Sequence, residues 1–187
     1  HMRYLAQFAP KGQIAGCSQE TNPSPRTARG VVIGIEAALD HVCGMPVELG
    51  EASYAIQGLG SVGMSILDML WKAGARNLFV ADADNSRIRK VDLGTGIITT
   101  FAGSSMPVAA AGVGGYSGDG GAATRAEIFH PTGVAVDENG NLFIADQFNN
   151  RIRKVDVRTG VITTLAGVGG MRGGFSGDGS PAVRGEL

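Results

Sequence analysis

The chain has 187 residues, 30 of them glycine, and its 16 basic and 17 acidic side chains give a formal net charge of −1. This length suits one domain or two small ones, and 43% apolar with 18% charged residues excludes wholesale disorder. The balanced charge favours neither nucleic acid nor an anionic membrane. No apolar run reaches a membrane span of about 18 residues, and Cys17 and Cys43 lack the spacing of a metal site. We therefore expect a cytoplasmic protein with no metal site and no membrane contact.

The first 76 residues alternate between helical and strand patterns. Apolar residues recur every three or four positions over 27–42, which predicts a helix, and Gly44 and Pro46 end it. Further along we expect a strand over 53–57, a glycine-rich loop over 58–63, a helix over 64–73 and a strand over 78–81. This order is typical of the strand–helix–strand unit that opens a dinucleotide-binding domain.

The glycine-rich loop has the spacing GxGxxG at Gly58, Gly60 and Gly63. In that spacing the first glycine allows a tight turn, the second lets a pyrophosphate approach, and the third packs helix against strand. Asp82 stands about where a ribose-binding carboxylate belongs. The alternative is a plain glycine turn between a strand and a helix.

Two longer segments carry a family resemblance. Residues 22–38 read NPSPRTARGVVIGIEAA and residues 55–63 read AIQGLGSVG. They resemble the cofactor domain of leucine, phenylalanine and glutamate dehydrogenases, and the resemblance covers about residues 22–84. It implies a Rossmann-like βαβ fragment that binds NAD, with Thr27 near the nicotinamide, Gly58, Gly60 and Gly63 on the pyrophosphate and Asp82 on the adenosine ribose.

The same resemblance places the catalytic lysines of these dehydrogenases in a substrate domain on the N-terminal side, which we expect this chain to lack. None of the four lysines present, Lys11, Lys72, Lys90 and Lys154, has a matching context. Oxidative deamination then has no base to activate water. We therefore expect no catalytic residue, and NAD binding that is weak if it occurs.

The second half contains an internal repeat. Residues 77–103 recur 64 residues later as 141–167 with 19 of 27 positions identical, and the glycine-rich segment 115–121 recurs as 174–180. A further strand over 133–137 precedes the turn at Asn139 and Gly140. One unit therefore has four strands, roughly 133–137, 141–146, 151–156 and 161–166, which is typical of a propeller blade.

This half resembles NHL-repeat β-propellers. The resemblance implies an α+β chain, with a Rossmann-like fragment over 1–76 followed by about two four-stranded antiparallel NHL-type blades over 77–187. Because such propellers serve as recognition platforms, it also implies a non-catalytic binding or scaffold module with a protein ligand. The alternatives are an NAD-dependent amino-acid dehydrogenase of the leucine or phenylalanine type, and weak RNA binding through the two RIRK segments, 87–90 and 151–154.

The polar residues of the repeat also have plainer interpretations. Asp82 has a counterpart in Asp146, which favours a carboxylate that caps a turn at the end of a strand. We interpret the Ser-Gly-Asp-Gly connectors as tight turns, because one carboxylate is sparse for calcium. An acidic residue follows each RIRK segment directly, so we expect solvated strands with local ion pairs. His41 and His130 are expected to be isolated.

Two blades leave faces without neighbours. The apolar residues expected on such faces are Phe79, Val91, Ile98, Phe143, Ile144, Val155 and Ile162. Large exposed apolar patches are rare on monomers, which favours a homo-oligomer, a trimer or a dimer, over a monomer whose N-terminal helices cover the open blade. We also expect a dehydrogenase-like strand or helix to replace the missing first strand of the first blade.

Overall fold

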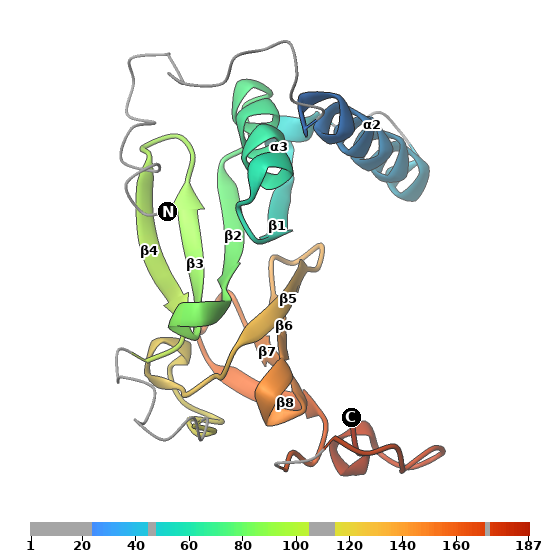
Figure 1. The fold of residues 1–187 in the computed structure, drawn as a ribbon, viewed down its shortest axis with the longest axis vertical. Helices are drawn as coiled ribbons and strands as arrows, with labels where there is room; N and C mark the ends of the chain where they lie inside the picture. Colours follow the sequence, from blue (N-terminus) through green and yellow to red (C-terminus); the bar gives the residue numbers. More distant parts are fainter. Residues whose placement is uncertain (1–23, 45–47, 105–114, 171–172) are drawn as a thin grey trace. The chain divides into compact units, whose positions relative to one another are not determined.

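The computed structural model describes residues 24–44, 48–104, 115–170 and 173–187, which form helices and two four-stranded sheets (Figure 1). The longer elements are helices α2 (Ser24–Cys43) and α3 (Ser61–Lys72) and strands β1 (Ser53–Gln57), β2 (Asn77–Asp82), β3 (Arg87–Asp92), β4 (Ile97–Ala102), β5 (Pro131–Val136), β6 (Leu142–Asp146), β7 (Arg151–Val155) and β8 (Ile162–Ala166). Short 3-10 turns include η3 (Ala83–Asn85), η4 (Ala123–Arg125), η5 (Gln147–Asn149) and η6 (Ala182–Arg184). The predicted helices and strands are confirmed, with ends that differ by at most three residues.

The second sheet has the strand order β5-β6-β7-β8, and every neighbouring pair is antiparallel. The turn between β5 and β6 is closed by Asp137, whose carboxylate accepts hydrogen bonds from the backbone N–H groups of Asn139 and Asn141. The register shifts between Ile152 and Arg153, where β7 pairs with β8. This sheet confirms the four-stranded antiparallel unit predicted from the repeat.

The first sheet has the order β1-β2-β3-β4. Strands β2, β3 and β4 come from the first copy of the repeat, while β1 comes from the dehydrogenase-like segment and takes the place that β5 has in the second sheet. In the strand order, a dehydrogenase-like strand therefore stands where the first blade strand is expected. The link from β1 to β2 passes through helix α3, which is the usual connection between parallel neighbours. The structure shows this strand–helix–strand order, and a complete Rossmann-like fragment remains an expectation.

The chain forms two compact units. One comprises residues 1–53, 58–78 and 91–98, and its described part holds both helices; the other comprises 54–57, 79–90 and 99–187, and holds the second sheet. Each unit draws segments from both sides of residue 76. The domains predicted over 1–76 and 77–187 therefore mark a change of sequence type, and as structural domains they remain a prediction.

In the first unit, α2 packs against α3. Ala28 and Val32 are buried on α2, one turn apart on its apolar stripe, and Leu67 and Leu70 are buried on α3. The Oγ of Ser24 at the start of α2 donates to the Oγ of Ser61 at the start of α3, at 3.0 Å. The first turns of the two helices are therefore held together by a polar contact as well as by apolar packing.

In the second unit, one apolar cluster joins strands of the two sheets. Its buried members are Phe79, Ala81, Ile88 and Ala102 from β2, β3 and β4, Ala123, Ala126 and Ile128 from the connecting segment, and Leu142, Ile144, Val155 and Ile162 from β6, β7 and β8. The Phe79 ring also meets the Phe101 ring edge to face, with centroids 4.8 Å apart. Repeat strands thus bury their faces against each other within one chain.

This packing corrects one expectation from the sequence. Of the seven apolar residues predicted on uncovered faces, five are buried: Phe79, Val91, Ile144, Val155 and Ile162. Phe143 and Ile98 are only partly buried. The pattern identified apolar strand positions correctly, but it overestimated how many of them a chain with two sheets leaves open.

Replacing Ile144 by alanine should lower the free energy of unfolding by about 2–5 kcal/mol, because the fully buried side chain would leave a cavity between the sheets. Urea denaturation monitored by circular dichroism measures this change. Thr163→Ala, at an exposed position in β8, is the control and should stay within about 0.5 kcal/mol. Equal effects of the two substitutions would contradict the packing described.

Candidate functional site

The glycine-rich loop lies between β1 and α3. Gly58 has a left-handed backbone with φ +74°, which disfavours other residues. Gly60 is the N-cap of α3 with an extended backbone, and no side chain caps that helix end. Gly63 lies in the first turn of α3, while Thr27 is exposed in the first turn of α2. Thr27 and the three glycines all belong to the first compact unit.

Asp82 ends β2 and belongs to the second compact unit. Its Oδ1 accepts a hydrogen bond of 2.8 Å from the side-chain amide of Asn85, in the turn that follows. Its repeat counterpart Asp146 likewise accepts from Asn149, at 2.9 Å. The shared contact supports the interpretation of both carboxylates as turn residues.

A buried polar cluster lies on the second sheet around Arg153; with Asp119, Asp146, Asn149 and Tyr116 we call it the Arg153 cluster. The Arg153 side chain is 0% exposed, and arginine is almost never buried without partners. Its Nη2 donates to Asp119 Oδ1 at 2.7 Å, and its Nη1 donates to Asp146 Oδ2 at 3.4 Å. Arg153 also donates to the carbonyls of Glu127 and Ser117, at 3.3 and 3.2 Å.

Asp146 is the fully buried acid of the cluster. Its Oδ1 accepts from the backbone N–H of Phe129 at 2.7 Å, and its Oδ2 accepts from Asn149 and Arg153. Burial raises the pKa of Asp146 above its ordinary value, although these three donors offset part of the rise. Asn149 continues the network by donating to the Gly115 carbonyl at 3.0 Å.

Asp119 and Tyr116 come from the first glycine-rich connector. The Tyr116 hydroxyl donates to Asp119 Oδ2 at 2.8 Å and lies 2.8 Å from the Thr164 hydroxyl. The Tyr116 ring lies under the guanidinium of Arg151, 3.5 Å from its centroid. Burial raises the pKa of Asp119, but hydrogen bonds from Thr164 and Tyr116 together with the charge of Arg153 outweigh it and hold the pKa below the ordinary value.

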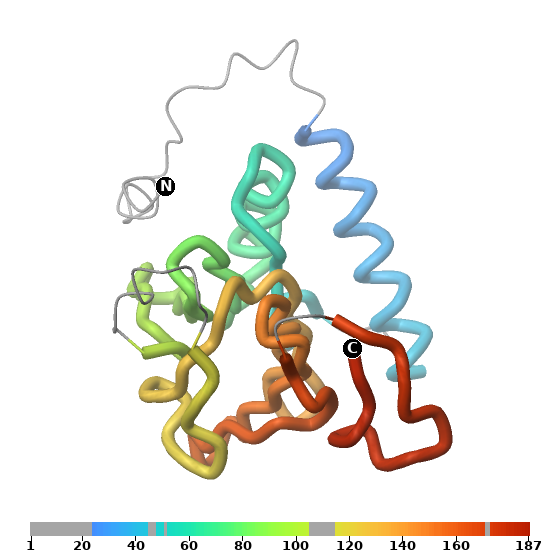
Figure 2. Tube along the Cα trace, turned by 60° about the horizontal axis from the view of Figure 1, so that its bottom comes forward, coloured from blue at the N-terminus to red at the C-terminus, as the bar shows by residue number. Residues whose placement is uncertain are grey.

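The cluster attaches connector 1, residues 115–128, to the second sheet. Connector 1 and its repeat, connector 2 (residues 174–187), can be followed in yellow and in red in Figure 2. Three backbone hydrogen bonds add to the attachment: Gly120 N–H to Ile162 O, Ile162 N–H to Gly121 O, and Ala123 N–H to Gly160 O, at 2.8, 3.0 and 2.9 Å. The charged groups are therefore engaged in holding this segment in place.

These contacts correct one interpretation of the sequence and add to another. The RIRK segment of β7 is not simply solvated, because Arg153 is fully buried and Arg151 covers an aromatic ring. The connectors do form tight turns, with positive φ at Gly118 and Gly120, but Asp119 is also the closest acidic partner of Arg153. Sequence spacing gave no sign of this pairing, since 34 residues separate the two groups.

His130 is not isolated either. Its ring stacks on that of Phe148, with centroids 4.5 Å apart, and its Nε2 lies 3.8 Å from Asp84 Oδ1. His41 lies in the last turn of α2 as expected. Within the described ranges, no group of three or more His, Cys, Asp or Glu residues is placed to hold a metal ion, and no helix is long and apolar enough to cross a membrane.

Replacing Arg153 by methionine should lower the free energy of unfolding by about 3–5 kcal/mol, because Asp146 would keep a buried charge without its partner. The matched control is Arg89→Met at the equivalent, half-exposed position of β3, where about 1 kcal/mol or less is expected. Urea denaturation of both variants and of the parent protein measures the difference. Similar losses in the two variants would contradict the burial of Arg153.

The stability contributed by Asp119 should depend on pH. Its folded-state pKa is lowered, so the unfolded chain binds more protons between the two pKa values and stability rises with pH there. The contribution is complete above the ordinary pKa of about 3.9 and is lost as pH falls through the folded value. Thermal midpoints of the parent and of Asp119→Asn should therefore differ at pH 7 and converge in strong acid; a constant difference would contradict this.

Known proteins match the two halves of the chain separately. The family model described as Teneurin NHL domain matches residues 112–175. NHL repeat-containing protein 2 of Homo sapiens is 38% identical over 94 residues, which are 49% of this chain and 12% of that protein. Phenylalanine dehydrogenase of Caldalkalibacillus thermarum (strain TA2.A1) is 41% identical over 69 residues, which are 37% of this chain and 18% of that enzyme.

A solved structure, a protein of unknown function from Bacteroides thetaiotaomicron VPI-5482, matches with a TM-score of 0.46 and 22% identity over 59% of this chain and 28% of its own. The chain thus spans less than a fifth of the length of the curated relatives described above. The sequence matches establish its two-part nature: it combines NHL-type repeats with a segment similar to phenylalanine dehydrogenases.

Proposed function

We propose that the chain is a non-catalytic NHL-type module that binds a protein partner or serves as a scaffold. The Arg153 cluster is the observation that carries this proposal. Every charged group in it is engaged by another residue of the sheet or of connector 1, and the described residues contain no cluster suited to a metal. The ionisable groups of this cluster therefore serve the fold, which supports a function carried by the surface of the second sheet.

The dehydrogenase alternative needs a desolvated lysine, and the described lysines provide none. Lys72 is 73% exposed in its side chain and pairs with Asp68 at 2.6 Å. Lys154 is partly exposed on β7, with its Nζ 5.6 Å from the Phe143 ring centroid, and Lys90 is its counterpart on β3. A lysine that acts as a base near neutral pH requires burial or a neighbouring charge that lowers its pKa. These positions favour a structural role for the dehydrogenase-like segment.

Weak NAD binding is a second candidate, favoured by the glycine-rich loop. A Cβ added at Gly58 or Gly60 would meet no atom within 4 Å, so the loop leaves room for a phosphate before the uncapped N-terminus of α3. The loop thus fits a pyrophosphate, with Thr27, Gly63 and Asp82 as the further NAD residues that the dehydrogenase resemblance implies. NAD would supply a hydride acceptor.

The RNA alternative is weakened by the same residues that build the second sheet. Phosphate recognition needs guanidinium or ammonium groups that a ligand can reach. Arg153 is fully enclosed, and Arg151 is held against Tyr116 and the Val168 carbonyl, the latter at 2.6 Å. We therefore infer that nucleic acid is not the partner of this sheet.

The purified protein should form no NADH from NAD with leucine or phenylalanine, and NAD should bind with a dissociation constant no tighter than about 1 mM, or roughly 4 kcal/mol. Absorbance at the NADH band and isothermal calorimetry measure the two quantities. Turnover that scales with protein concentration and disappears in Gly58→Val would overturn the non-catalytic assignment. Micromolar binding that is lost in Gly60→Ala with Asp82→Ala would instead overturn only the weak-cofactor expectation.

A further inference from the structure

The turn between β5 and β6 places an asparagine directly before a glycine. Asn139 is exposed, and its side-chain amide forms no hydrogen bond with another described residue; only its backbone N–H is engaged, donating to Asp137 Oδ1. Gly140 has φ +80°, in the left-handed region that favours glycine. Because glycine has no side chain to screen its backbone nitrogen, that nitrogen is open to react with the amide carbon of the preceding side chain.

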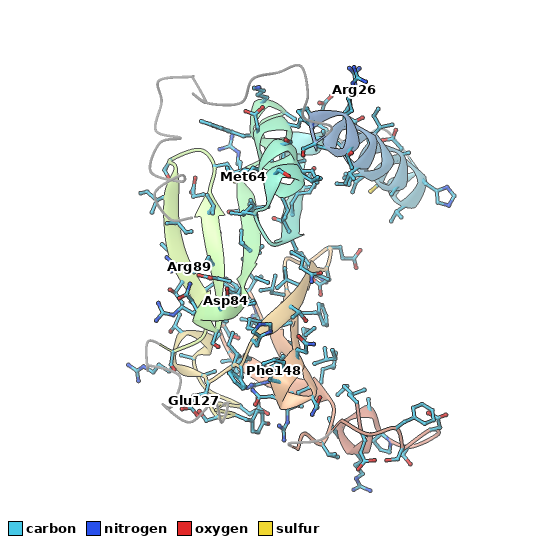
Figure 3. The ribbon with its side chains drawn as sticks, viewed as in Figure 1. Arg26, Met64, Asp84, Arg89, Glu127 and Phe148 are labelled. Carbon is cyan, nitrogen blue, oxygen red and sulfur yellow. The ribbon has the colours of Figure 1, made fainter. Side chains whose placement is uncertain are left out.

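The other asparagines of the described ranges lack this combination. Phe148, labelled in Figure 3, marks the turn between β6 and β7 in which two of them lie. Asn77 begins β2 and is followed by Leu78, whose side chain screens the next nitrogen. The remaining asparagines have side-chain amides that donate hydrogen bonds: Asn85, Asn141, Asn149 and Asn150. Among the residues that the structure describes, only Asn139 combines exposure, a free amide and a following glycine.

We propose that Asn139 is a site of spontaneous deamidation. The backbone nitrogen of Gly140 forms a bond to Cγ of Asn139, the bond from Cγ to Nδ2 breaks, and Nδ2 leaves as ammonia with the proton of the Gly140 N–H. Water then opens the cyclic succinimide at either of its carbonyl groups, which leaves aspartate or isoaspartate at this position. The net reaction consumes water and releases ammonia, and it needs no other reactant.

The hydrogen bonds of the turn control the rate. Gly140 N–H donates to the Asp137 carbonyl at 2.9 Å, and this bond must open before the nitrogen can lose its proton. The Asp137 carboxylate keeps the turn closed by accepting from the N–H groups of Asn139 and Asn141, at 3.0 and 2.8 Å. Opening an exposed turn requires much less free energy than global unfolding. The reaction therefore proceeds in the folded protein, although more slowly than in the unfolded chain.

Both products change the turn. Each adds a carboxylate directly after Asp137 and Glu138, and like charges repel. Isoaspartate also inserts an extra carbon into the backbone before Gly140, which moves the Asn141 N–H away from the Asp137 carboxylate. Since turn geometry fixes the register of a hairpin, the pairing of β5 with β6 should loosen at this end. The inference goes beyond the proposed function and does not depend on it.

Peptide mapping of the folded full chain by mass spectrometry tests the proposal. Trypsin cleaves after Arg125 and Arg151, so one peptide, 126–151, carries Asn139. The same peptide holds three internal controls: Asn141, Asn149 and Asn150. The mass gained when an amide becomes a carboxyl group should localise to Asn139, and should accumulate faster at about pH 9 than at about pH 7, because the reaction requires the deprotonated Gly140 nitrogen. An isoaspartyl methyltransferase should label the isoaspartate product.

Two substitutions separate the reacting residue from the turn. Asn139→Gln should abolish the modification at this position, because the longer side chain would have to close a less favourable ring. Asp137→Ala should speed the modification of Asn139, because the turn opens more often. The matched control is Asp156→Ala, which removes the carboxylate that accepts backbone N–H groups in the turn between β7 and β8 and should leave the rate at Asn139 unchanged.

Circular dichroism establishes that each variant is folded. Modification of Asn139 in the urea-unfolded chain but not in the folded chain would overturn the proposal, since the turn would then protect this residue. So would modification of Asn149 or Asn150 before Asn139 in the folded protein. Equal rates in the parent protein and in Asp137→Ala would overturn the control assigned to the turn.

Discussion

The burial of the Arg153 guanidinium is the constraint on which the second sheet depends. Removing a charged group from water costs several kcal/mol unless opposite charge and hydrogen bonds replace the lost solvent. Asp146 on β6 provides one partner and Asp119 in connector 1 provides another. Since the strand and the connector each supply one carboxylate to the Nη atoms of Arg153, the two form a single cooperative element, while the buried Nε has no hydrogen-bond partner among the described residues. Tyr116 and Asn149 extend this coupling to Thr164 and to the start of the connector.

The first sheet contains the same repeat without that connector, and the equivalent side chains have different partners there. Arg89 and Asp82 occupy the equivalent positions, but among the described residues each has a local partner only, in Thr99 and Asn85. The residue types are identical, so the difference in burial arises from what precedes each sheet in the chain. Position within a repeat therefore does not determine the environment of a side chain, because the neighbouring segment decides whether a charge is buried.

Much of the fold could be predicted from the sequence because its signals are local. The apolar spacing of α2, the alternation in β6 and the glycine turn near Gly118 all depend on neighbours within a few residues. The pairing of Asp119 with Arg153, the stacking of His130 on Phe148 and the burial of Ile144 depend on contacts between distant segments. The turn geometry of the glycine-rich loop could be predicted from the spacing of its glycines. Cofactor binding depends on the groups that would contact the cofactor, which the backbone shape of the loop does not determine.

The replacement of a blade strand by β1 has a consequence for how such chains arise. A strand at that end of the sheet is held largely by main-chain hydrogen bonds, which every residue except proline can form on both sides. The position therefore accepts foreign sequence with the right length and apolar alternation. Here helix α3 follows the foreign strand. The sequence of Asn77–Asp82 fits both the dehydrogenase-like segment and the NHL-type repeat. A junction within this stretch keeps β2, β3 and β4 in the order of the repeat, so the foreign sequence replaces only the strand at the edge of the first sheet and leaves the pairing of the other three unchanged.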